Sequence, residues 1–198
     1  MPRGPVAQPP SDADALTFED AAEWETWLAE HHETSGGVWL RIAKKGSGRV
    51  SVTRGEALDV ALCYGWIDSH TRSCDEAYFL QRFSPRRSRS VWSKVNVAKV
   101  EELIAEGRMR PPGLAVVLAA QADGRWDAAY ESPRNVTVPE DLVEALEQDE
   151  RAKAFFHTLG KSDQYIVILR LMTARTPETR AARLGRMVAR LAAGEKVR

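Results

Sequence analysis

Arginines and serines are concentrated in the middle of this chain, in a stretch that contains no carboxylate. The stretch runs from Ala77 to Val100 and includes the segment Gln81-Arg-Phe-Ser-Pro-Arg-Arg87. Guanidinium groups bind carboxylates and phosphates through paired hydrogen bonds, and hydroxyls such as those of Ser84 and Ser90 add further donors. Because the formal net charge of the 198 residues is zero, a local purpose explains the basic stretch better than a global one. We therefore predict a site for a small anionic or planar ligand.

An acidic and a basic side chain precede this stretch at a spacing that allows proton transfer. Asp68 and His70 are two residues apart in a segment with the pattern of a strand, so they are expected to share one face with Trp66 and Arg72. A carboxylate can orient an imidazole for general acid–base catalysis. The alternative is a polar strand face, or a salt bridge from Asp68 to Arg72 or Arg82. Asp68 and His70 are the candidate catalytic residues, and whether any reaction occurs is left open.

The candidate ligand-binding residues combine cations, hydroxyls and aromatic rings. An exposed ring beside an arginine can stack on a planar ligand, whereas a buried ring only packs in the core. A helix beginning near Ser93 would add free backbone N–H groups that favour an anion. The candidates are Tyr64, Trp66, Arg82, Arg86, Arg87, Trp92, Ser93, Lys94 and Asn96.

A second basic face is expected near the C-terminus. Four arginines recur there near helical spacing, which is typical of a solvated face and also of a protein that binds a phosphate backbone. They are Arg180, Arg183, Arg186 and Arg190. The alternative function is therefore a nucleic-acid- or protein-binding stress module that uses the basic faces.

Other classes of site lack their sequence signatures. The histidines are scattered and no Cys/His cluster is present, so we expect neither a metal nor a cofactor. The turn Lys44-Lys-Gly-Ser-Gly48 lacks the pattern of a nucleotide-binding loop. Cys63 precedes a helix end, where negative charge is disfavoured, so we interpret it as a buried core residue and not as a nucleophile.

Cysteine usage and hydropathy bear on the location of the protein. Cys63 and Cys74 form no disulfide framework, which fits a reducing compartment. Residues 1–15 contain no apolar core of a secretory signal, and no run approaches the roughly 18 apolar residues of a membrane span. A cytoplasmic protein without a membrane span is the expectation, and its oligomeric state is left open.

The elements that must position these residues follow from periodicity and capping signals. Thr53 and Glu56 have the spacing of a capping box, and Gly65 is expected to end the helix that they begin. Strands are predicted at 38–43, 66–72 and 77–83. Helices are predicted at 19–32, 54–63, 93–106, 113–122, 139–148, 151–159, 163–174 and 177–193.

These elements predict an α+β fold, with a small, mostly antiparallel sheet flanked by helices and a helical C-terminal segment packed on it. The expected organisation is a disordered tail at 1–15, an α+β domain at 16–131, a linker at 132–138 and the helical C-terminal segment at 139–198. Prolines at 133 and 139 support the linker.

Long motifs in the chain resemble those of the YdeI/OmpD-associated family, also described as bacteriocin-protection proteins. The resemblance is carried by Glu23-Trp-Glu-Thr-Trp-Leu28, Gly37-Val-Trp-Leu-Arg-Ile-Ala-Lys-Lys45, Ala57-Leu-Asp-Val-Ala-Leu-Cys-Tyr-Gly-Trp-Ile-Asp68, Gln81-Arg-Phe-Ser-Pro-Arg-Arg87, Val91-Trp-Ser-Lys-Val-Asn96 and Ala174-Arg-Thr-Pro-Glu-Thr-Arg180. It implies a role in stress or bacteriocin protection and supplies no established reaction. The family name refers to an association with porins, which would require export from the cytoplasm.

Overall fold

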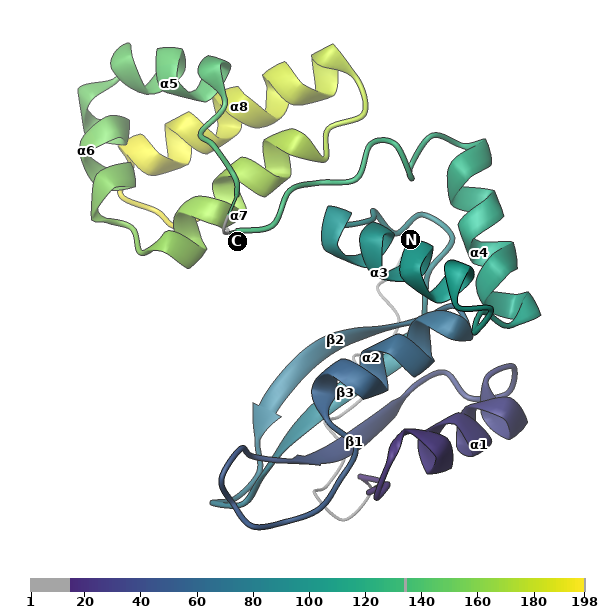
Figure 1. The fold of residues 1–198 in the computed structure, drawn as a ribbon. Coiled ribbons are helices and arrows are strands. Elements are labelled where there is room, and N and C mark those ends of the chain that lie inside the picture. Colours follow the sequence, from purple (N-terminus) through teal and green to yellow (C-terminus); the bar gives the residue numbers. More distant parts are fainter. Residues whose placement is uncertain (1–14, 134, 198) are drawn as a thin grey trace. The chain divides into compact units, whose positions relative to one another are not determined.

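The chain folds into helices and one small sheet (Figure 1). The computed structural model describes residues 15–133 and 135–197, so the tail predicted at 1–15 lies almost entirely outside the described residues. The described residues form eight helices and a three-stranded antiparallel sheet, which confirms the α+β class.

Contacts within the chain define two compact units. The first consists of residues 15–90 and 98–126, and the second of residues 91–97 and 127–197. Each unit is therefore built from two separate stretches of sequence. The domain and linker boundaries drawn from the sequence stay predictions.

The sheet of the first unit has the strand order β1-β3-β2, with both pairings antiparallel. Its strands are β1 (Val38–Ala43), β2 (Trp66–Ser73) and β3 (Tyr78–Pro85), which confirms the three predicted strands to within two residues at each end. Alternate residues point to opposite faces of such a sheet. The two faces of this sheet consequently carry different side chains.

A β-bulge interrupts β2 between Asp68 and Thr71. Asp68 pairs with Phe83 and Thr71 pairs with Gln81, so three steps along β2 match two along β3. The extra residue inverts the alternation, which moves Arg72 to the face opposite Asp68. The predicted common face of Trp66, Asp68, His70 and Arg72 is therefore wrong beyond Asp68.

A buried glutamine is hydrogen-bonded to the bulge. Gln81 is fully buried, its side-chain oxygen accepts a hydrogen bond of 2.7 Å from the Thr71 hydroxyl, and its amide nitrogen donates one of 3.2 Å to the His70 carbonyl. A buried amide is stable only with such partners. Gln81 thereby holds the backbone of the bulge at His70 and the side chain of Thr71.

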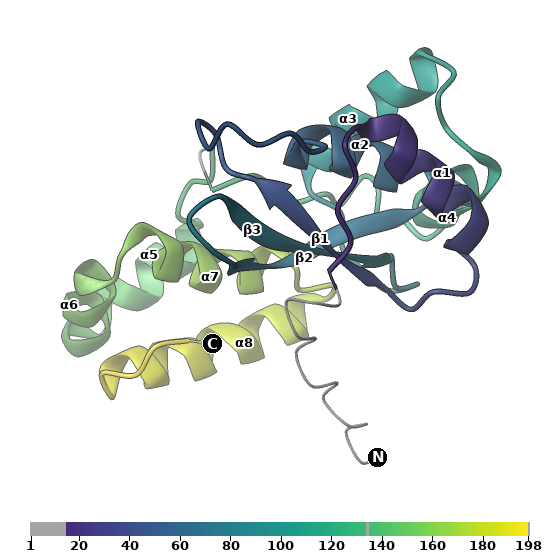
Figure 2. The same ribbon diagram turned by 90° about the horizontal axis from the view of Figure 1, so that it is seen from below.

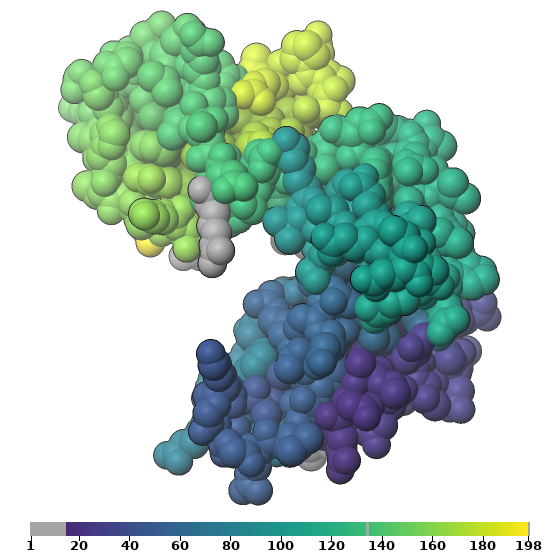
Figure 3. All heavy atoms as spheres, in the orientation of Figure 1, coloured from purple at the N-terminus to yellow at the C-terminus, as the bar shows by residue number. Residues whose placement is uncertain are grey.

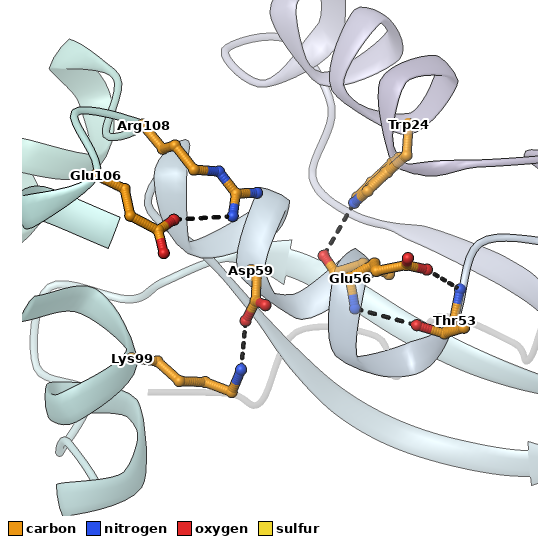
Figure 4. A network of polar contacts seen from close by, with 8 residues as sticks. Trp24, Thr53, Glu56, Asp59, Lys99, Glu106 and Arg108 are labelled. Carbon is orange, nitrogen blue, oxygen red and sulfur yellow. Dashed lines mark hydrogen bonds and ion pairs between the residues drawn. The ribbon is translucent and has the colours of Figure 1, made fainter. Parts of the chain in front are cut away.

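Helices α1 (Ala21–His31) and α2 (Arg54–Cys63) cover one face of the sheet (Figure 2). The ring of Trp24 lies 5.7 Å from that of Phe83 on β3, and its indole N–H donates a hydrogen bond of 3.0 Å to the Ala57 carbonyl on α2 (Figure 4). Burial of a tryptophan with its polar atom satisfied contributes to the core without a desolvation penalty. The core of the first unit lies between these two helices and the sheet.

The start of α2 is capped as the sequence predicts. The Thr53 hydroxyl accepts a hydrogen bond from the Glu56 backbone N–H, and the Glu56 carboxylate accepts one from the Thr53 N–H (Figure 4). The backbone hydrogen bond from Thr53, with the one from its hydroxyl, lowers the pKa of Glu56. The capping box is confirmed.

Helices α3 (Lys94–Ala105) and α4 (Pro111–Ala122) follow the sheet. Lys99 of α3 forms an ion pair of 2.5 Å with Asp59 of α2 (Figure 4). Helix α4 lies on the surface of the first unit (Figure 3), where Leu118 is 63% exposed.

Glycine is required where α4 meets the end of α2. A Cβ atom on Gly113 would lie 2.1 Å from the Cys63 carbonyl oxygen, well inside van der Waals contact. The close approach buries Cys63 and Val117. A larger residue at position 113 would force the two helices apart.

The second unit is a group of four helices with its own apolar core. The helices are α5 (Glu140–Glu147), α6 (Glu150–Thr158), α7 (Lys161–Met172) and α8 (Pro177–Ala192), which confirms the four predicted there. Fully buried members of the core include Leu142, Val167, Leu171 and Leu191. Residues 91–97 join this unit through backbone hydrogen bonds from Lys94 to Tyr130 and from Tyr130 to Trp92. No helix in the described ranges is long and apolar enough to cross a membrane.

Candidate anion-binding groove

A groove of about 550 Å³ opens on the first unit. Its lining combines two arginines, a histidine and three serines with two apolar residues and a glycine. The lining residues are Gly36, Ile67, Ser69, His70, Arg82, Ser84, Pro85, Arg87 and Ser90. None of them carries a carboxylate, so the charged groups of the lining are all basic.

The groove uses the sheet face opposite the one covered by α1 and α2. Ile67 of β2 pairs directly with Ser84 of β3, and Arg82 shares that face because it is two residues from Ser84. The bulge contributes Ser69 and His70 from the adjacent part of β2. Bulges redirect side chains in this way at many functional sites.

Two consecutive glycines seat the guanidinium of Arg82. Its Nη2 atom donates a hydrogen bond of 3.4 Å to the Gly36 carbonyl. Gly37 has φ +134°, and a Cβ atom there would lie 2.8 Å from Nη2 of Arg82 and 2.9 Å from the Phe83 carbonyl oxygen. Any other residue at position 37 would displace the arginine and strain the backbone.

The loop after β3 buries one arginine and exposes the next. Arg86 is 9% exposed, and its backbone N–H donates to the Gly65 carbonyl, whereas the side chain of Arg87 is exposed and lines the groove. Arg125, itself 7% exposed, donates a hydrogen bond of 3.0 Å from Nη1 to the Ser90 carbonyl. The buried arginines support the loop, and Arg87 supplies its accessible charge.

The cations of the groove keep their charge available to a ligand. Among the described residues, neither Arg82 nor Arg87 forms an ion pair with a carboxylate. Asp68 lies on the opposite face of the sheet, where its carboxylate accepts a hydrogen bond of 2.8 Å from Arg54 at the start of α2. Within the part of the chain that the structure describes, no hydrogen bond joins Asp68 to the imidazole of His70. The salt bridge that the sequence offered as the alternative role of Asp68 is present, with Arg54 as its partner in place of Arg72 or Arg82.

The aromatic candidates are buried. Tyr64, Trp66 and Trp92 are 8%, 1% and 2% exposed, and Trp66 donates its indole N–H to the His32 carbonyl at 3.3 Å. Burial raises the pKa of the Tyr64 hydroxyl. Stacking on a ligand requires an accessible ring face, so these three residues are not candidates for ligand binding in the groove.

The remaining candidates belong to the second unit, where they have local partners. The Ser93 hydroxyl accepts a hydrogen bond of 3.2 Å from the Asn96 N–H at the start of α3, and Lys94 forms an ion pair with Glu131. The sequence thus identified His70, Arg82 and Arg87 among the groove residues and added several residues with structural roles.

Cys63 behaves as the sequence predicts. The residue is 3% exposed, and burial raises the pKa of its thiol to about 11, despite the nearby charges of Arg108 and Arg110. A thiol with this pKa is protonated at neutral pH, and only the thiolate is a strong nucleophile. A cysteine-based reaction at this position has no support.

Four groove residues were missed by the sequence reasoning: Gly36, Ile67, Ser69 and Pro85. The glycine pair carried a usable signal, because two adjacent glycines allow a close approach of another side chain as well as a break in a helix. Ser69 had no such signal in the sequence. It lines the groove because of the β-bulge, and the residues around it do not predict a bulge.

Comparison with known families divides the chain in two. A family model described as "Domain of unknown function (DUF8412)" matches residues 16–116, slightly more than half of the 198 residues. A second model, described as "Bacteriocin-protection, YdeI or OmpD-Associated", matches residues 135–194 and confirms the family resemblance over the C-terminal part. No curated protein and no solved structure matches the chain.

Proposed function

Because the chain belongs to the family described as Domain of unknown function (DUF8412), whose description assigns no activity, we propose a function from the chain's own residues. The first unit binds a small anionic ligand in the groove beside β2 and β3. One observation carries the proposal: His70, Arg82, Arg87 and three serines line the same groove, and no lining residue is acidic.

The fold leaves the positive charges of Arg82 and Arg87 without a carboxylate partner among the described residues. A concave surface lined by cations raises the local concentration of anions, and guanidinium groups bind oxyanions with paired hydrogen bonds. The three hydroxyls and the imidazole supply further donors at the same place. An anion would therefore find both charge and hydrogen bonds in the groove.

Calorimetric titration of the purified chain with sodium phosphate, citrate and glucose 6-phosphate tests the proposal. The variants Arg82→Ala and Arg87→Ala should each weaken anion binding about tenfold or more, which corresponds to about 1.4 kcal/mol. Arg89→Ala is the matched control, because this exposed arginine lies in the same loop and does not line the groove. Equal loss in Arg87→Ala and Arg89→Ala would mean that general charge, and not the groove, attracts the anion.

The wider role proposed for the protein is cytoplasmic protection against stress or bacteriocins. Its support is the family description matched by residues 135–194, together with the reduced thiols of Cys63 and Cys74. Fractionation of cells that express the full chain tests the location, and recovery in the membrane or secreted fraction would contradict it.

Nucleic-acid binding is the second candidate, and the arginines of α8 weaken it. Arg180 is held by Asp141, and Arg183 donates a hydrogen bond of 2.7 Å to the Arg170 carbonyl. Binding to a phosphate backbone would weaken linearly with salt on a log–log scale. A slope of that kind with duplex DNA or RNA would favour this candidate over the groove.

A further inference from the structure

We infer that the ligand of the groove is a phosphate monoester of a hydroxylated, non-aromatic compound, with sugar phosphates as the representative class. This inference rests on the proposed function and adds the chemical class of the ligand. It follows from the charge, the size and the composition of the groove.

The charge of the groove fits a phosphate monoester better than a carboxylate. Arg82 and Arg87 contribute two positive charges, and His70 adds an imidazole that can form a hydrogen bond. A phosphate monoester carries about −1.5 to −2 charges at pH 7 and three terminal oxygens that accept hydrogen bonds, whereas a carboxylate carries one charge and two oxygens. A phosphate monoester therefore offers the two guanidinium groups and the serine hydroxyls more negative charge and more acceptor oxygens than a carboxylate does.

The groove is large enough for a ligand bigger than an inorganic ion. Its volume of about 550 Å³ falls within the range of roughly 300–1,000 Å³ that is typical of sites for organic ligands. A water molecule occupies about 30 Å³ of liquid, and a phosphate ion has only five heavy atoms. Most of the groove would stay filled with solvent around a bare phosphate.

The rest of the lining indicates which kind of organic group extends from the phosphate. Ile67 and Pro85 offer apolar contact to a carbon skeleton, and Ser69, Ser84 and Ser90 can each donate to and accept from a hydroxyl group. The lining contains no Phe, Tyr or Trp, so a nucleobase would find only the small imidazole of His70 as an aromatic ring on which to stack. A hydroxyl-rich skeleton without an aromatic ring fits these groups best.

The test is calorimetric titration of the full chain, in a buffer free of phosphate, with five probes. Glucose 6-phosphate is compared with glucuronate, which has a carboxylate at the same ring position, and with glucose, inorganic phosphate and AMP. We expect glucose 6-phosphate to bind at least tenfold more tightly than each of the other four. Arg87→Ala should remove this preference, and Arg89→Ala should retain it.

The outcomes separate the ligand class from the proposed function. Glucuronate binding as tightly as glucose 6-phosphate would overturn the phosphate assignment while the anion groove survives. If inorganic phosphate or AMP binds as tightly as glucose 6-phosphate, the inference that the ligand is hydroxylated and non-aromatic is overturned. Absence of binding by every anionic probe, or binding of glucose 6-phosphate that is unchanged in both Arg82→Ala and Arg87→Ala, would overturn the groove itself.

Discussion

The arginines of the groove and those of α8 occur at similar density and are used differently. In α8, Arg180 contacts both oxygens of Asp141 and Arg190 contacts Glu195, so two of the four arginines are neutralised within the second unit. In the groove, the side chain of Arg82 forms a hydrogen bond with the Gly36 carbonyl and no ion pair with a carboxylate of the described residues. Arginine density alone therefore does not identify a binding site, and the proposed anion site rests on arginines that lack a carboxylate partner and line a concave surface.

The largest expected effect comes from disturbing the seat of Arg82. Gly37→Ala would place a methyl group 2.8 Å from the guanidinium at φ +134°, so the chain should lose about 2 kcal/mol of unfolding free energy and bind anions about tenfold more weakly. Urea denaturation and calorimetric titration measure the two effects.

Gly36→Ala is the matched control for stability. A Cβ atom on Gly36 meets nothing within 4 Å, so its unfolding free energy should stay within about 0.5 kcal/mol of wild type. Equal destabilisation by both substitutions would show that Arg82 is not held by the close approach at Gly37.

Removal of a neutralised arginine should affect stability alone. Arg180→Ala takes away the ion pair with Asp141 and a hydrogen bond of 3.0 Å to the Leu171 carbonyl. Both side chains are about one-third exposed, so solvent screening limits the expected loss to about 1 kcal/mol. Anion affinity at the groove should not change. A tenfold loss of affinity would contradict the distinction between the arginines of α8 and those of the groove.

The same ion pair predicts a pH dependence. Hydrogen bonding from Arg180 lowers the pKa of Asp141 below its ordinary value of 3.8, against the opposing effect of burial. A lowered pKa gives stability that is present above the ordinary value and is lost as the pH falls through the folded-state pKa. The stability difference between wild type and Arg180→Ala should therefore be larger at pH 7 than at pH 2.5. A difference that grows on acidification would contradict this linkage.

The smallest effect is expected at Arg186, which is exposed on α8. No ion pair joins it to another described residue, so Arg186→Ala should change stability by less than about 0.5 kcal/mol and leave anion affinity as it is. A loss of duplex DNA affinity in this variant would identify α8 as a phosphate-binding face and sharpen the second candidate function.

Local rules were sufficient for most of the fold. The spacing of Thr53 and Glu56 predicted a cap that forms, and Gly65 ends α2 with φ +74° as expected. Such features depend on residues within one turn of each other, so a single sequence contains the information. Helix and strand positions were predictable for the same reason.

The site was less predictable because it depends on tertiary relations. The bulge that moves Arg72 away from Asp68 is stabilised by Gln81, which lies on another strand. The ring of Trp66 is buried by helices from earlier in the chain. The residue pattern of β2 does not predict this burial. The positions of the arginines could be read from the sequence, but the residues that pair with them could not.

The division of α3 between the two units has a consequence for how the protein is made. Residues 91–97 belong to the second unit, yet the ribosome completes them before residues 98–126 of the first. At about 5–20 residues per second, this segment must wait for seconds until Tyr130 emerges to accept its backbone hydrogen bond. A gene cut between the two family matches would separate residues 91–97 from the C-terminal residues with which they form the second unit.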